Sequence, residues 1–428
     1  MNTLGKKFNI IFLIFVSFIF FGAVFWLYQK HTVPNDSTIS EWLINYQGGF
    51  TRRGIIGEIS FQFAKLHDLN LRFTIFLFQS FIYLSYSILV YIFIKDVPKN
   101  ILTVTALFSP LFLLYPLAEL EVLARKEVFL FVGFIIFLIL LNTKYSKNTS
   151  FVYIFFTFPF LILIWEPFIF FFPFPIFLLL LKNKDAPLKI SLIKIFLSFS
   201  TSLFTIIYIL LNLLTPMEHL LMEKSLMDNF NEICYMSCAL LKSKSSINAQ
   251  FLSVYNLFSF EVFFRYTTIL LIGFLPLSIL LLNTKLRSEF LLINLFKKKY
   301  YKIDNIFLIF IFMLLPSLLL LASMTDWGRT INIMYTFSIL TFIHLVKNNL
   351  VLINNNIIFF DKFYIHKKKL FVLLFVIFAF GWNPKTAITG DVATNSLYKI
   401  LYNTSKKIFN FNGIRIFQNS PVIKFHKK

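Results

Sequence analysis

The stretch FVYIFFTFPFLILIWEPFIFFFPFPIFLLLL (151–181) decides how the rest of the chain crosses a membrane. As one helix its 31 residues would extend about 46 Å, whereas the apolar core of a bilayer is about 30 Å thick. Pro167, in the Trp165-Glu166-Pro167 sequence at its middle, favours a break because proline has no backbone N–H. We therefore predict two short helices, Phe151–Ile164 and Phe168–Leu181, that form a hairpin or a re-entrant pair.

Apolar runs on both sides of this hairpin define the fold class. The chain is 58% hydrophobic and 14% charged, whereas a soluble domain carries about 25% charged residues. We predict an all-α polytopic transmembrane helical bundle of about 10–12 spans. The further segments are 8–28, 73–94, 101–117, 128–141, 190–214, 266–282, 306–321, 331–346 and 370–382.

Lysine-rich connections set the predicted orientation. With the N-terminus inside and a hairpin at 151–181, the lysine-rich loops all fall on the inner side, as the positive-inside rule requires. A single span there would instead place the Lys297–Lys299 cluster outside. The loops predicted to face outward are about 29–72, 118–127, 215–265 and 322–330. We expect the functional site on that outer side.

The ends of the chain and its net charge fit a membrane domain. We predict a polytopic domain over 1–382 and a basic tail over 383–428. The net charge of +21 is explained by retained loop lysines, so no nucleic-acid partner is predicted. No small-residue cleavage site follows the first apolar run, which indicates a retained first helix.

Arginine is distributed unlike lysine. Arg287 is the exception among the inner loops, and the other arginines are assigned to the outer side: Arg52, Arg53, Arg72, Arg125, Arg265, Arg329 and Arg415. Positive charge is disfavoured there, so these side chains need a specific use. One interpretation is bidentate binding of phosphate. The other is pairing with carboxylates such as Glu58, Glu127 or Asp326, which would fix the loops.

The segment Asn45–Glu58 contains Gly48, Gly49, Arg52 and Arg53. Glycine lets backbone N–H groups approach a ligand, and adjacent guanidiniums suit phosphate oxygens. We interpret these four residues as substrate-binding, for a lipid-linked phosphate or pyrophosphate. A tight turn with arginines on lipid headgroups is the alternative. The segment has no Walker lysine and follows no strand, so neither nucleotide fingerprint applies.

Two other outer segments combine carboxylates with cations. In Glu119–Glu127, helical spacing places Glu121 beside Arg125, where the two would form an ion pair. At the membrane boundary the segment would instead present Arg125 and Lys126 to a pyrophosphate, with a nearby carboxylate as base. A solvated ion-pair cluster is the alternative there. In the Asp326-Trp327-Gly328-Arg329 turn, Asp326 and Arg329 are expected to pair, and Trp327 offers either a sugar-stacking face or an interfacial anchor.

Glu166 stands out because long apolar runs flank it. Ionisable residues at membrane depth are costly and mark functional sites. Burial would raise its pKa and suit it to proton transfer, although pairing with an outer arginine is the alternative. Cys234 and Cys238 would permit a disulfide in an oxidising compartment. Without clustered histidines they do not predict a zinc site, and no metal or cofactor is predicted.

Taken together, the many spans, the sizeable outer loop 215–265 and the outer arginines resemble the Wzy-type O-antigen and capsular polysaccharide polymerases. The residues carried over are Arg52 and Arg53, Arg125 in Ala-Arg-Lys-Glu, and Arg329 in Asp-Trp-Gly-Arg. The chain departs from the family because its 215–265 loop has few arginines.

The resemblance implies polymerisation of polyprenyl-pyrophosphate-linked oligosaccharide repeat units on the outer side of a bacterial plasma (inner) membrane. Membrane lipid and a chain-length regulator protein are the implied further partners. The outer arginines would stabilise the departing pyrophosphate, and Glu166, Glu121 or Asp326 would serve as the catalytic base. Two alternatives stay open. One is a C-type glycosyltransferase with a polyprenyl-phosphate sugar donor, whose first-loop base would be Asp36 or Glu41. The other is a lipid-linked glycan transporter or flippase.

Overall fold

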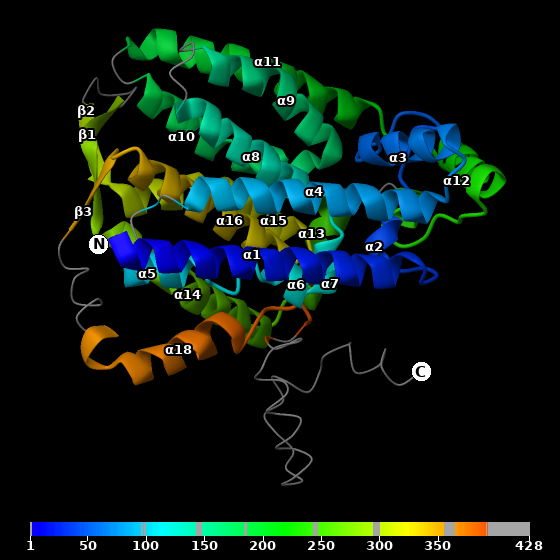
Figure 1. Cartoon of the computed structure of the whole chain (residues 1–428). Helices are drawn as coiled ribbons and strands as arrows, with labels where there is room; N and C mark the ends of the chain where they lie inside the picture. The colour runs from blue at the N-terminus through cyan, green and yellow to red at the C-terminus, as the bar shows by residue number, and fades with distance from the viewer. Residues whose placement is uncertain are drawn as a thin grey trace. The chain divides into compact units, whose positions relative to one another are not determined.

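The computed structural model describes residues 2–95, 97, 100–142, 148–183, 186–242, 247–293, 300–354, 364–390 and 392. These residues are mainly helical (Figure 1). Six of the described helices have at least 18 residues and are apolar enough to cross a membrane. They are α1 (Asn2–His31), α4 (Leu71–Ile94), α11 (Leu188–Leu211), α14 (Phe260–Leu282), α15 (Ile306–Ser323) and α16 (Trp327–Lys347). The predicted class of an all-α polytopic membrane protein is confirmed, while the predicted 10–12 spans and their orientation stay predictions.

The break in the stretch 151–181 is confirmed. Helix α9 (Thr149–Ile164) ends before Trp165, whose backbone is extended with φ −155° and ψ 101°. A 3₁₀ turn, η1 (Glu166–Phe171), follows and leads into α10 (Pro173–Lys182). Pro167 lies in the first turn of η1, where its missing N–H costs nothing. Glu166 is therefore held at the connection between two apolar helices.

The predicted span 101–117 is wrong. It forms α5 (Ile101–Leu107), an irregular turn and the short helices α6 (Tyr115–Ala118) and α7 (Leu120–Leu123). Pro110 explains the break, since a proline removes a helical hydrogen bond and disfavours helical backbone at the residue before it. Asn332 Nδ2 donates to the carbonyl oxygens of Leu111 (2.8 Å) and Phe112 (3.2 Å) and so satisfies acceptors that the break leaves.

The chain divides into two compact units. The N-terminal unit comprises 6–95 and 123–246, and the C-terminal unit comprises 1–5, 96–122 and 247–428. In the N-terminal unit α9 packs against α11 and α8, and α8 (Glu127–Asn142) packs against α4. Its remaining elements are α2 (Ser37–Ser40), α3 (Ile55–Leu66), α12 (Pro216–Phe230) and η2 (Ala239–Lys242).

The C-terminal unit is arranged around α16. In its apolar stretch 94% of the residues are buried, a larger share than in any other candidate span among the described helices. Helices α14 and α15 pack against it. A three-stranded antiparallel sheet, in the order β2-β1-β3, joins β1 (Thr284–Ile293), β2 (Tyr300–Asn305) and β3 (Val351–Ile353). The sequence predicts lysine-rich inner connections in this region and does not indicate the strands. Helices α13 (Ile247–Leu257) and α18 (Lys368–Phe380) complete the described elements.

Candidate functional site

The segment Asn45–Glu58, which contains the predicted glycine and arginine residues, lies between α2 and α3 and includes the first turn of α3. Its glycines allow other parts of the backbone to approach closely. A Cβ atom on Gly48 would overlap the carbonyl oxygen of Glu218 on α12. A Cβ atom on Gly57 would overlap the carbonyl oxygen of Ile44. Gly49 has φ +140°, which favours glycine. Gly48 and Gly49 thus serve the packing of this loop on α12, and their predicted contact with substrate stays a prediction.

Arg53 connects three parts of the N-terminal unit. Its guanidinium holds Glu166 in a two-point contact, with Nε 2.8 Å from Oε2 and Nη2 2.8 Å from Oε1. Its carbonyl oxygen accepts a hydrogen bond from Lys126 Nζ at 2.7 Å. The backbone of Arg53 has φ +62°, a left-handed conformation that is unusual for an arginine. Such strain is found preferentially at ligand-binding and active sites, where the surrounding contacts hold it.

Arg52 is the least constrained cation of the group. Its guanidinium donates a single hydrogen bond among the described residues, from Nη1 to Glu166 Oε1 at 3.4 Å. Its side chain keeps 33% of its surface exposed. Because a guanidinium has five N–H donors, most of the donors of Arg52 remain able to bind an anion.

Glu41 is the second carboxylate of the group. Its side chain is 1% exposed and lies between two arginines, 3.6 Å from Arg53 Nη1 and 3.5 Å from Arg125 Nη1. Arg125 Nη1 also donates to Ser237 Oγ at 3.0 Å. We call Glu41, Arg52, Arg53, Arg125, Lys126 and Glu166 the arginine cluster. All six belong to the N-terminal unit.

Lys126 lies fully buried at the base of this cluster. Its ammonium group lies 6.0 Å from the centre of the Trp42 ring, and Trp42 Nε1 donates to the Ala124 carbonyl oxygen at 2.6 Å. Burial lowers the pKa of Lys126 to about 8, and the nearby Arg53 adds to the effect, against the attraction of Glu41 and Glu166. This lysine therefore remains mainly protonated at pH 7 but loses its proton at a lower pH than an ordinary lysine does.

The expectation that burial raises the pKa of Glu166 is wrong. Burial alone would raise it, but the Arg53 guanidinium and then Arg52 outweigh burial and hold the pKa below its usual value. In this arrangement Glu166 is ionised and serves as an acceptor for two arginines. Proton transfer to it requires that these arginines first be drawn away.

The other predicted site residues belong to the C-terminal unit. Asp326 and Arg329 pair as predicted, with Oδ2 3.2 Å from Nη1, and Arg329 is buried. Trp327 is also buried: its ring packs edge-on against Tyr266, and its Nε1 donates to the Leu321 carbonyl oxygen at 2.6 Å. A sugar-stacking surface at Trp327 therefore has no support among the described residues.

Glu121 does not have the helical spacing to Arg125 that we predicted, because α7 ends at Leu123. Its carboxylate lies 3.7 Å from Lys385 Nζ, and the buried Glu119 lies 2.9 Å from the same ammonium. Lys385 comes from the start of the predicted tail. Residues 383–390 pack onto the start of α16, where Gly328 N–H donates to the Thr386 carbonyl oxygen at 3.1 Å. Most of the tail, including Arg415, lies outside the described residues.

Every described arginine that we assigned to the outer side has a carboxylate neighbour, which supports the interpretation that these arginines pair with carboxylates. Arg72 holds Glu232 in a two-point contact, and Arg265 Nη2 lies 2.9 Å from Glu261. The partners are mostly not those that the sequence suggested, since Glu58 instead accepts from Tyr46 N–H and Gln47 Nε2. What separates the arginine cluster from these pairs is its excess of cations.

The cysteines form a disulfide, Cys234–Cys238. The structure also brings a histidine to them, which the sequence did not indicate: His219 Nε2 lies 3.5 Å from Cys234 Sγ. The ligand atoms of these three buried residues lie within 4.8 Å of one another, a spacing that could hold a metal ion, but the two sulfurs are bonded to each other. The group therefore serves here to close the loop that carries Ser237.

Sequence reasoning missed the place of Glu41 at the centre of the cluster and the place of Lys385 beside Glu119. A signal for Glu41 was present, because it is a lone carboxylate in Thr38–Tyr46.

No family model matches the chain, and neither a curated protein nor a solved structure matches it.

Proposed function

We propose that this protein polymerises polyprenyl-pyrophosphate-linked oligosaccharide repeat units into a surface polysaccharide, by glycosyl transfer at the outer side of the bacterial plasma membrane. The observation that supports this most is the arginine cluster. The cluster contains four cations and two carboxylates in contact with one another, so its net charge is +2. The cations are Arg52, Arg53, Arg125 and Lys126, and the carboxylates are Glu41 and Glu166. A diphosphate carries the complementary charge and can use several N–H donors at once.

The reaction needs stabilisation of a leaving group. An acceptor hydroxyl oxygen attacks C1 of the donor sugar, the bond from C1 to the pyrophosphate oxygen breaks, and the lipid pyrophosphate leaves with the bonding electrons. Arg52, which has unused donors, and Arg53, which is held by its backbone, are placed to receive that charge. N–H donors that bind the charge developing on the leaving oxygen lower the barrier to its departure.

Glu166 is the base that this arrangement favours. When diphosphate oxygens bind the guanidiniums of Arg52 and Arg53, Glu166 loses these cationic partners. The effect of burial on Glu166 is then no longer offset, and its pKa rises. The carboxylate then accepts the proton of the acceptor hydroxyl. Asp326 and Glu121, the other predicted bases, already face Arg329 and Lys385 in the C-terminal unit.

One observation favours the second candidate, a C-type glycosyltransferase with a polyprenyl-phosphate sugar donor. Such an enzyme is expected to use an acidic base in its first outer loop, and Glu41 of that loop lies buried between Arg53 and Arg125. A monophosphate donor and a requirement for Glu41 would distinguish this candidate from the polymerase.

The test is the surface-glycan ladder of a strain that lacks this protein, complemented with wild type, Arg52→Ala or the control Lys65→Ala at equal protein levels. Lys65 is an exposed cation on α3, in the same predicted outer segment. The polymerase proposal predicts a long ladder with wild type and Lys65→Ala, and a single repeat with Arg52→Ala. An incomplete repeat in the deletion strain would favour the glycosyltransferase. A deletion strain whose ladder is the same as that of the strain complemented with wild type would exclude both functions.

A further inference from the structure

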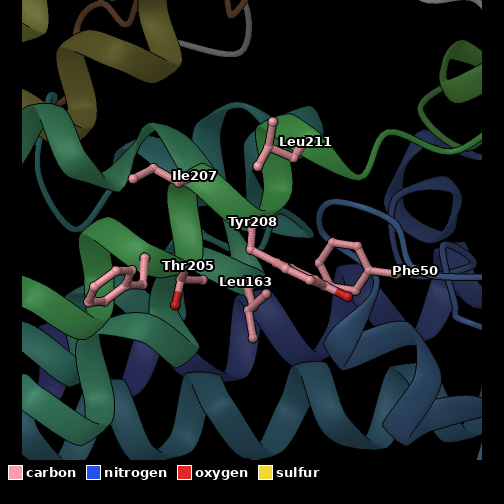
Figure 2. A pocket seen from close by; sticks show the side chains of 7 residues that line it. Phe50, Leu163, Thr205, Ile207, Tyr208 and Leu211 are labelled. Atoms are coloured by element: carbon pink, nitrogen blue, oxygen red, sulfur yellow. The ribbon is translucent and has the colours of Figure 1, made fainter.

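The N-terminal unit contains an apolar groove between α9 and α11, with a volume of about 510 Å³ (Figure 2). Helix α11 supplies most of its walls. The lining residues are Phe50, Leu163, Phe204, Thr205, Ile207, Tyr208 and Leu211. The Thr205 hydroxyl donates to the Thr201 carbonyl oxygen at 2.9 Å, so it presents little unsatisfied polarity to the groove.

The groove is open on the side that membrane lipid would occupy. Phe204 is 71% exposed and Leu211 is 78% exposed, on a helix apolar enough to span the bilayer. Exposed apolar side chains on such a helix contact hydrocarbon in a membrane. A hydrocarbon chain can therefore enter this groove sideways without passing through water.

The same segments build the groove and the arginine cluster. The centroid of the Phe50 ring lies 4.7 Å from that of Tyr208, in an edge-on contact. Figure 2 shows the two rings side by side, and Phe50 lies two residues before Arg52. Two residues of extended backbone span at most about 7 Å. Leu163, on the opposite wall, lies three residues before Glu166. The backbone of Arg52 therefore lies within about 7 Å of the groove-lining Phe50.

We propose that this groove holds the hydrocarbon chain of a long-chain lipid phosphate while Arg52 and Arg53 bind its phosphate head. The inference rests on the proposed function and adds the path of the lipid chain. Charge complementarity selects this occupant over a neutral lipid or an apolar protein helix. Neither of those would place an anion next to Arg52, whose guanidinium donates only one hydrogen bond among the described residues.

The experiment uses the full chain in nanodiscs and measures binding of three probes: a long-chain polyprenyl diphosphate, the neutral polyprenol of the same length, and inorganic pyrophosphate. Ile207→Trp fills the groove. Leu210→Trp is the matched control, because Leu210 is an exposed residue of α11 outside the lining. Phe204→Ala removes one wall, which tests the groove without adding bulk. Arg52→Ala removes the proposed head contact.

We expect Ile207→Trp and Phe204→Ala to weaken binding of the polyprenyl diphosphate by about tenfold or more, because part of the buried chain returns to lipid. Pyrophosphate binding should stay unchanged in both, and Leu210→Trp should resemble wild type with every probe. Arg52→Ala should weaken binding of both diphosphate probes.

Two results overturn the groove inference and leave the proposed function standing. One is a normal affinity of Ile207→Trp and Phe204→Ala for the polyprenyl diphosphate while Arg52→Ala weakens it. The other is equally tight binding of the neutral polyprenol, which would make the groove a general lipid surface. If Arg52→Ala changes the binding of neither diphosphate probe, the proposed function fails, and the inference fails with it.

Discussion

Arg53 shows how one residue organises the arginine cluster. Its left-handed backbone turns the carbonyl oxygen toward Lys126 while its guanidinium faces Glu166. Glu41 and Glu166 are joined through this residue, since it contacts both carboxylates. The strength of the Arg53–Glu166 contact can be separated from the neighbouring Arg52–Glu166 contact, because the two differ in geometry.

A double-mutant cycle of Arg53→Ala and Glu166→Ala should give a coupling free energy of about 1–3 kcal/mol, because two short charge-assisted hydrogen bonds are lost together. The cycle of Arg52→Ala and Glu166→Ala is the control and should give less, since it removes one contact of 3.4 Å. Thermal unfolding in detergent measures both. Equal coupling in the two cycles would contradict the geometry.

Lys126 predicts a pH dependence of stability. Its folded pKa of about 8 lies below the ordinary lysine value of 10.5, so the folded protein loses this proton at lower pH than the unfolded chain does. The cost of burying the charge is therefore fully present below about pH 8 and is relieved as the pH rises toward 10.5.

The unfolding midpoint should be measured from pH 7 to 11 for wild type and Lys126→Met. Wild type should gain stability relative to the variant between pH 8 and 10.5. Parallel pH profiles for the two proteins would show that Lys126 titrates normally.

Among the elements, the α9–η1–α10 hairpin determines on which side the later loops lie. The break at Trp165 agrees with the predicted hairpin, in which both open ends face the same side of the membrane. Asn148→Cys and Asn183→Cys are introduced one at a time into a chain that carries Cys234→Ser and Cys238→Ser. Both cysteines should react with an impermeant maleimide added on the same side of the membrane. Asn35, in the first predicted outer loop, is the reference position. Labelling of Asn148 and Asn183 from opposite sides would mean that 151–181 crosses once.

The whole molecule has a predicted direction in the membrane, and the disulfide tests it. A Cys234–Cys238 bond is expected to persist only where the compartment is oxidising, which is the predicted outer side of the 215–265 loop. Protein denatured without reductant after expression in cells should incorporate no maleimide, and reduced protein should incorporate it at both cysteines. Labelling without reductant would show that the bond does not form in cells and would contradict the outward placement of this loop.

The sequence determined the features that depend on neighbouring residues. Lengths of apolar runs predicted the spanning helices, and a proline within 151–181 predicted the hairpin, because bilayer thickness and helix rise limit what a run can do. Apolar length alone also predicts one span over 101–117, but Pro110 breaks the helix there. The break is stabilised by Asn332, which donates to the Leu111 and Phe112 carbonyl oxygens from 221 and 220 residues away.

Only the tertiary structure decided which charges meet. Arg53 and Glu166 are 113 residues apart, Arg125 and Glu41 are 84 apart, and Lys385 reaches Glu119 across 266. A buried charge must find a partner, and the sequence shows that the charges are there. It does not show which ones the packed helices bring within reach, because that choice depends on how distant segments lie against one another.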